Sequence, residues 1–172
     1  MGIDATTGGL AQTPHPNALG SALTHPHITT DYSEALLEFV TGTHNSPKAA
    51  INQLEQLHIF ASSVLEGERI WPLSMPCLLP DSDADIPLAY YGESHIGRLK
   101  TVYRRGLGFR YGRQMQTIAG VHFNLSFSDD FWLWKAALDT NPDISDIRGI
   151  RDAGYFQTIR NFRRIQWLIM LL

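Results

Sequence analysis

The residues best suited to chemistry lie in a segment of alternating character, residues 115–127. Its odd positions are mostly apolar, whereas its even positions include the amide, imidazole and hydroxyl groups of Gln116, His122, Asn124 and Ser126. In a β-strand, this period of two places one set of side chains against a core and the other set on the opposite face. The polar face is either the floor of a ligand site or the solvent side of an edge strand.

A second group of polar residues, Asp31, Glu34 and Glu38, is compatible with two local structures. In a helix, Asp31 would be the N-cap and Glu34 would complete a capping box, which is a structural role. In a strand, Glu38 would lie among apolar neighbours, where a lone carboxylate needs a cation. Residue propensity favours the helix, and the sequence alone leaves both alternatives open.

Carboxylates from this acidic group, together with His122, would form an oxygen-rich site for a divalent metal ion. Mg²⁺ or Mn²⁺ suits such a site, because it would contain no thiolate and only one imidazole. The alternative role of His122 is that of a structural residue with satisfied hydrogen bonds.

Two further candidates, Tyr103 and Leu107, lie one turn apart on a predicted helix and therefore project from the same face. They would form either an aromatic and aliphatic wall for a small substrate or ordinary core. The glycines match neither a Rossmann turn nor a P-loop, and no grouping of serine, histidine and an acid indicates a hydrolase.

The composition of the 172 residues, 44% hydrophobic and 18% charged, is that of a globular protein. The net charge of -3 gives no overall electrostatic case for binding nucleic acid or an anionic membrane. A single cysteine, Cys77, excludes an internal disulfide and a multi-cysteine zinc site. Residues 1–9 lack the basic and apolar regions of a signal peptide, so the expected location is the cytoplasm.

The local patterns predict a mixture of helices and irregular segments. Residues 1–24, rich in Gly, Thr, Pro and Ala, are expected to be an irregular lead-in. Capping, spacing and apolar periodicity predict helices over 47–64, 96–111 and 155–172. The strand at 115–127 is followed by a short apolar segment at 131–138 and a polar connection at 141–152. The apolar end of the chain indicates a core element whose partners are missing.

Several strings, in one order, resemble the glutamate–cysteine ligase of proteobacteria. They are GSALTH at 20–25, ITTDYSEALLEF at 28–39, WPLSMPC at 71–77, YGESHIGRLKTVYRRGL at 91–107 and MQTIAGVHFN at 115–124. The similarity covers roughly Pro14 to Arg164, and a set of separate motifs is far more specific than one short pattern.

The resemblance implies an α+β chain that is part of a glutamine-synthetase-like fold, with a curved antiparallel sheet around the active site and helices on its outer face. It also implies an ATP-dependent ligase, in which phosphorylated L-glutamate reacts with the amine of L-cysteine. The product is γ-glutamylcysteine, in the first step of glutathione biosynthesis. Mg²⁺ or Mn²⁺ would offset the negative charge of the phosphate oxygens.

The resemblance assigns roles to particular residues. Asp31, Glu38 and His122 match metal ligands, which implies a strand rather than a helix at Glu38. The substrate-binding positions are matched by Tyr32, Tyr103, Leu107, Gln116, Ile118 and Asn124. Tyr32 stands where the family often has phenylalanine.

The chain also departs from the family pattern. The family begins with a strand that carries two metal-binding glutamates as Gly-x-Glu-x-Glu, whereas the first glutamate here is Glu34. Members continue for several hundred residues more, and the similarity fades after Arg164.

We therefore expect residues 1–172 to be a single incomplete catalytic domain with a divergent apolar end at 165–172, inactive by itself. The alternative is a non-catalytic remnant that binds a divalent metal or a small amino acid, or that pairs with a complementary fragment.

Overall fold

The computed structural model describes residues 1–138 and 145–171, which form two compact units, Met1–Val121 and His122–Leu172. Each unit is described by itself. The prediction that both belong to one incomplete catalytic domain stays a prediction. The mixture of helices and small antiparallel sheets confirms the α+β class.

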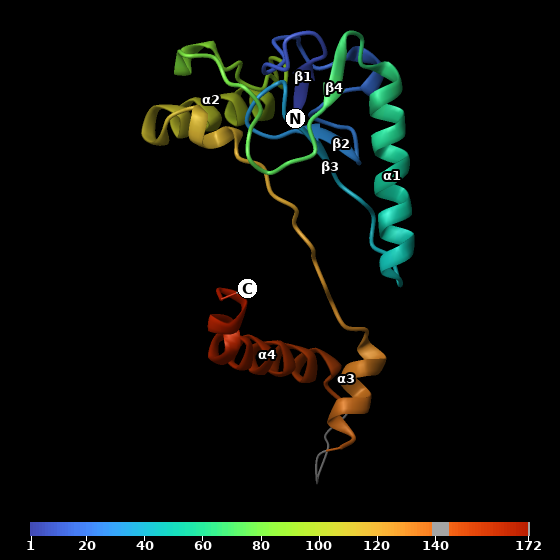
Figure 1. Ribbon diagram of the computed structural model, residues 1–172. Helices are drawn as coiled ribbons and strands as arrows, with labels where there is room; N and C mark the ends of the chain where they lie inside the picture. Colours follow the sequence, from blue (N-terminus) through green and yellow to red (C-terminus); the bar gives the residue numbers. More distant parts are fainter. Residues whose placement is uncertain (139–144, 172) are drawn as a thin grey trace. The chain divides into compact units, whose positions relative to one another are not determined.

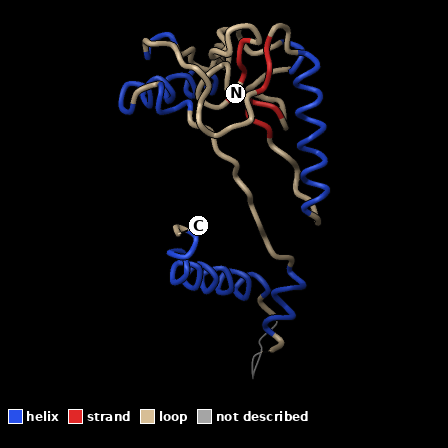
Figure 2. Tube along the Cα trace, in the orientation of Figure 1, coloured by secondary structure: helices blue, strands red, loops and turns tan. Residues whose placement is uncertain are grey.

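The first unit contains two short two-stranded sheets. Strand β1 (Gly2–Asp4) pairs antiparallel with β4 (Glu68–Ile70), and β2 (Ile28–Thr30) pairs antiparallel with β3 (Leu37–Phe39). Figure 2 shows these strands among long loops. Because β1 lies inside residues 1–24, the expectation of a wholly irregular lead-in is wrong at its start, where pairing with β4 supplies backbone partners.

Helices α1 (Pro47–Val64) and α2 (His95–Tyr111) lie on either side of these strands (Figure 1). Helix α1 begins at the predicted residue, and α2 begins one residue before the predicted Ile96. The side chains of Ser46 and Ser94 cap the two helices by accepting hydrogen bonds from main-chain N–H groups in the first turn. Three short 3-10 turns complete the unit: η1 (Asn17–Leu19), η2 (Asp83–Asp85) and η3 (Gln114–Thr117).

The core of the first unit is divided into small clusters. The largest, which we call the Tyr32 cluster, contains the buried residues Met1, Leu10, Ala11, Tyr32, Ala35, Leu36 and Ile86. A second cluster lies beneath α1 and includes Leu19, Ile28 and Ala61. The β2–β3 hairpin therefore contributes to both clusters, its loop to the Tyr32 cluster and its strand residue Ile28 to the second.

The second unit consists of α3 (Asp129–Ala136) and α4 (Ile147–Ile169), which pack together. Trp132 is fully buried and contacts the Tyr155 ring edge-on at 4.8 Å between centroids. Helix α4 starts earlier than the predicted 155, because the Asp146 side chain caps it by accepting a hydrogen bond from Gly149 N–H at 2.9 Å. Residues 141–144 of the predicted polar connection lie outside the described residues.

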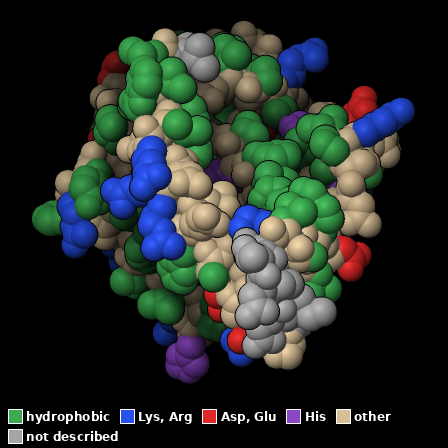
Figure 3. All heavy atoms as spheres, turned by 90° about the horizontal axis from the view of Figure 1, so that it is seen from below, with side chains coloured by type: hydrophobic (Ala, Val, Ile, Leu, Met, Phe, Trp, Pro, Cys, Tyr) green, Lys and Arg blue, Asp and Glu red, His purple; other side chains and the backbone are tan. Residues whose placement is uncertain are grey.

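Much of α4 remains uncovered, because α3 is only eight residues long. Hydrophobic side chains are prominent at the surface (Figure 3), and those of α4 include Phe156, Phe162, Trp167 and Leu168. None of the helices within the described ranges is long and apolar enough to span a membrane.

The predicted strand at 115–127 is wrong. Residues 114–117 form η3, and residues 118–128 have no regular structure. The apolar odd positions Val121, Phe123 and Leu125 are exposed by 92%, 72% and 69%. A strand needs a neighbouring strand to satisfy its backbone, and none in the part of the chain that the structure describes pairs with this segment.

Candidate functional site

The β2–β3 hairpin carries two of the predicted metal ligands. Glu38 lies in β3 opposite Thr29, so the side chains of these two residues project from the same side. Asp31 directly follows β2, in the bend that leads toward β3. The other face carries Ile28 and Thr30, which are buried, while the Asp31 and Glu38 side chains are exposed. The strand alternative for Glu38 is confirmed.

The main chain at Asp31 is held by several hydrogen bonds. Its N–H donates to the Leu36 carbonyl oxygen at 2.9 Å, which closes the loop between β2 and β3. Its own carbonyl oxygen accepts from the Arg104 Nε of α2. The Tyr91 hydroxyl donates to the Thr30 carbonyl at 2.5 Å and lies 3.1 Å from the Asp31 carbonyl. The exposed carboxylate of Asp31 is therefore attached to a main chain that is held by hydrogen bonds.

Tyr91 is surrounded by charge. Lys100 Nζ and the Arg104 guanidinium carbon lie 4.8 and 4.6 Å from the centroid of its ring. Burial raises the pKa of its hydroxyl, Arg104 lowers it, and the carboxylates of Asp31 and Glu38 raise it further. Both carboxylates thus act on the same hydroxyl.

Glu34 has a structural role, but not the one expected from a capping box. Its carboxylate accepts from the main-chain N–H of His15 at 2.9 Å and from that of Tyr90 at 2.6 Å. The carboxylate therefore links the loop between β2 and β3 to two other loops, both of which are distant in sequence. Short-range spacing could not reveal this role, because the two donors belong to main chains 19 and 56 residues away.

Tyr32, a predicted substrate contact, lies in the apolar interior with only 2% of its surface exposed. Its hydroxyl has no hydrogen-bond partner among the described residues. It faces Gly108 of α2, where an added Cβ would lie 2.2 Å from the hydroxyl oxygen. Burial raises the pKa of this hydroxyl, so it remains a neutral phenol.

Removal of the Tyr32 hydroxyl is expected to stabilise the protein. A buried hydroxyl without a partner loses its hydrogen bonds to water, and no hydrogen bond within the protein replaces them. Tyr32→Phe should therefore raise the free energy of unfolding by about 1 kcal/mol. Urea unfolding followed by circular dichroism would measure this change. Tyr91→Phe, the matched control, removes a hydroxyl that has partners and should change stability in the opposite direction. A loss of stability in Tyr32→Phe would contradict the burial argument.

Tyr103 and Leu107 differ in their surroundings although both belong to α2. Leu107 packs against the Tyr32 cluster, whereas the Tyr103 side chain is 63% exposed. The reading of the two residues as ordinary core is therefore wrong for Tyr103. An exposed aromatic ring next to a half-buried leucine leaves apolar surface available on this side of the helix.

Gln116 and Ile118 follow a stretch of main chain that is held by a contact the sequence did not indicate. The Asp83 carboxylate accepts from the main-chain N–H groups of Arg113 and Gln114, each at 2.8 Å. These two bonds lower the pKa of Asp83, so the carboxylate stays charged. The acidic loop after Pro80 therefore fixes the chain where α2 ends and η3 begins.

His122 and Asn124 belong to the second unit and are exposed in an irregular segment. The three predicted metal ligands are thus divided between the units, with Asp31 and Glu38 in the first. Within residues 1–138 and 145–171, no group of three His, Cys, Asp or Glu side chains is close enough to hold a metal ion. Asp31 and Glu38 fit Mg²⁺ or Mn²⁺ as hard oxygen donors, and the complete ligand set stays a prediction.

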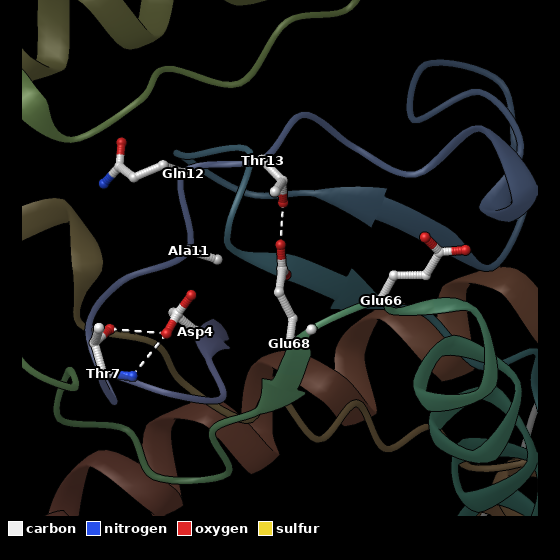
Figure 4. Close-up of a pocket in the computed structure, with 8 residues that line it drawn as sticks. Asp4, Thr7, Ala11, Gln12, Thr13, Glu66 and Glu68 are labelled. Carbon is white, nitrogen blue, oxygen red and sulfur yellow. Dashed lines mark hydrogen bonds between the residues drawn. The ribbon is translucent and has the colours of Figure 1, made fainter.

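A cavity of about 320 Å³ lies elsewhere in the first unit (Figure 4). Its lining includes Asp4, Thr13, Glu66 and Glu68, and none of the predicted site residues. The Asp4 carboxylate accepts from Thr7 in its own turn, and Glu68 accepts from the Thr13 hydroxyl. Because none of the predicted site residues lines this cavity, it is separate from the candidate site.

Comparison with known proteins gives one consistent family. The glutamate–cysteine ligase family model matches residues 3–172. A glutamate–cysteine ligase of Azotobacter vinelandii is 54% identical over 173 residues, which cover 99% of this chain and 32% of that protein. One from Bordetella petrii is 55% identical over 170 residues, covering 99% and 31%. The chain therefore spans about a third of the length of these curated relatives.

Solved structures agree. The crystal structure of a Francisella tularensis glutamate–cysteine ligase in complex with AMP matches with a TM-score of 0.81 at 40% identity, over 98% of this chain and 32% of that one. A bifunctional glutathione synthetase from Pasteurella multocida matches with a TM-score of 0.80 at 30% identity, over 96% and 21%. The family match extends through residues 165–172, beyond the expected limit at Arg164.

Proposed function

Because this chain belongs to the glutamate–cysteine ligase family, we propose that it forms part of an enzyme that uses ATP to join L-glutamate to L-cysteine. The product would be γ-glutamylcysteine, and the reaction would be the first step of glutathione biosynthesis. The match along residues 3–172 carries this proposal. The AMP complex of the Francisella relative supports an adenine nucleotide as a substrate. Cytoplasm is the compartment we propose, because thiols remain reduced there.

We assign Asp31, Glu38 and His122 to the binding of Mg²⁺ or Mn²⁺. Two observations support this assignment for Asp31 and Glu38: both side chains are exposed, and both carboxylates act on the Tyr91 hydroxyl. The bound ion would supply positive charge against the phosphate oxygens of ATP and of the glutamyl phosphate. Asp31 would hold its carboxylate in place through a main chain that is already bonded on both sides.

The substrate-binding assignment contains Tyr32, Tyr103, Leu107, Gln116, Ile118 and Asn124. The exposed Tyr103 ring and the half-buried Leu107 suit the aliphatic part of a small amino acid. Tyr32 would support Leu107, because Leu107 packs against the buried cluster to which Tyr32 belongs. Gln116 would offer an amide near the end of α2, at a position fixed by Asp83.

A chimera tests the assignment. The third of the Azotobacter relative that matches this chain would be replaced by the 172 residues, and ADP release dependent on both amino acids would be measured. We expect an active ligase in which Asp31→Asn or Glu38→Gln lowers kcat/KM by on the order of a hundredfold, because removal of a ligand costs at least as much as loss of its supporting groups.

Glu66→Gln is the matched control, since it neutralises an exposed carboxylate outside the proposed site. Full activity in the two site variants would refute the metal assignment. Saturable binding of Mg²⁺ or cysteine by a folded chimera that has no turnover would instead favour the non-catalytic remnant. We expect the isolated 172-residue chain to release no ADP, because two carboxylates cannot organise phosphoryl transfer alone.

A further inference from the structure

The candidate site has a supporting layer that lies beneath the Asp31 backbone. Two consecutive carbonyl oxygens, those of Thr30 and Asp31, are within reach of the Tyr91 hydroxyl and of the Arg104 guanidinium. The hydroxyl donates its one proton to Thr30 at 2.5 Å and lies 3.1 Å from the Asp31 oxygen. The main chain at Thr30 and Asp31 is therefore held by the same two side chains, those of Tyr91 and Arg104.

Tyr91 is itself fixed in place. Its side chain is buried together with Ala22 and Ala89. Two cationic side chains of α2, those of Lys100 and Arg104, lie over its ring. The ring cannot turn away without losing both cation–π contacts and its apolar neighbours. A hydroxyl on such a ring is a fixed hydrogen-bond donor, which is the property needed to orient another group.

From these contacts we propose that the Tyr91 hydroxyl is a positioning group that holds the Asp31 carboxylate in its binding geometry. This inference rests on the proposed function, because it takes Asp31 as a metal ligand. Tyr91 does not touch the ligand. It acts through the Thr30 and Asp31 carbonyl groups, and its removal leaves the carboxylate chemically intact but free to move.

The neighbouring tyrosine provides a matched control. The Tyr90 hydroxyl also donates a hydrogen bond, to Glu93 Oε1 at 2.6 Å, but that contact lies at the surface and away from Asp31. Tyr91→Phe and Tyr90→Phe each remove one hydroxyl oxygen and one hydrogen bond, and each keeps the ring. Only the first change should affect the candidate site.

The test uses the full 172-residue chain and Mn²⁺. The Kd for Mn²⁺ would be obtained from paramagnetic broadening of the amide signals of Thr30, Asp31 and Glu38, at a temperature where all variants are folded. Hydrogen exchange of the Asp31 amide, which bonds to Leu36, provides a second measurement that needs no metal. We expect Tyr91→Phe to weaken Mn²⁺ binding about tenfold and to speed this exchange, and Tyr90→Phe to do neither.

The outcomes separate the two proposals. If the wild-type chain shows no saturable broadening at these amides, the metal assignment of the proposed function is wrong and the inference is overturned with it. If the wild type binds Mn²⁺ and Tyr91→Phe binds it equally well, only the inference is overturned. Equal weakening in both tyrosine variants would also overturn it, because the effect would then come from a general loss of stability.

Discussion

Gly97→Ala should unfold the first unit at a temperature about 10 °C below that of the wild type. An added methyl group would lie 2.5 Å from the Tyr91 carbonyl oxygen and 2.6 Å from that of Gly92. Both atoms belong to the main chain, so no rotation of a side chain can relieve the clash. We expect a loss of about 3 kcal/mol, which is large for one methyl group.

The consequence of this substitution should extend to the candidate site. Helix α2 begins against the Tyr91–Gly92 peptide, and Tyr91 in turn bonds to Thr30. A shift of the helix start would therefore move the hydroxyl away from the hairpin. Thermal unfolding and hydrogen exchange at Asp31 would detect the two effects separately.

Gly106→Ala is the matched control on the same helix. A Cβ at Gly106 meets nothing within 4 Å, so alanine should raise the stability of α2 by up to about 1 kcal/mol through its higher helix propensity. If both substitutions lowered the melting temperature equally, the proposed contact at Gly97 would be wrong.

Gly154→Ala should separate α3 from α4 in the second unit. Three atoms of the Trp132 ring lie 2.2, 2.6 and 2.9 Å from the position of an added Cβ. The indole is rigid and fully buried, so the methyl group can be accommodated only if the two helices move apart. We expect a loss of about 2–3 kcal/mol and at least tenfold faster hydrogen exchange over residues 129–136.

The adjacent position offers a control for this change. Ala153 is exposed on the same helical turn, so Ala153→Leu adds more atoms without approaching the core. Exchange over 129–136 should then stay as in the wild type. Unchanged protection in Gly154→Ala itself would mean that the contact between Gly154 and Trp132 does not hold the helices together.

The sequence predicts some elements well because their signals are local. The serine caps of α1 and α2 depend on residues within one turn, and both helices were expected within a residue or so of their observed starts. The strand at Glu38 followed only from the family resemblance, since its residue propensities favour a helix. Its confirmation depends on pairing with β2, an interaction that propensity does not include.

The unpredicted features depend on partners far along the chain. The contacts of Glu34, Asp83 and Tyr91 are with main-chain groups 19 to 61 residues away. No spacing rule applies at that distance. The alternation of residues 115–127 is a genuine strand pattern, yet without a neighbouring strand among the described residues the segment begins in η3 and continues as irregular structure.

The hydrogen bonds at the end of β2 involve main-chain atoms of Thr30 and Asp31, not the Asp31 side chain. A substitution at position 31 by any residue other than proline, which lacks the N–H, therefore leaves every one of these bonds available. At this position the main-chain atoms hold the hairpin together, and the side chain alone determines which chemical group is presented. Natural selection can exchange the group that is presented, carboxylate for amide or hydroxyl, without first rebuilding the hairpin that presents it.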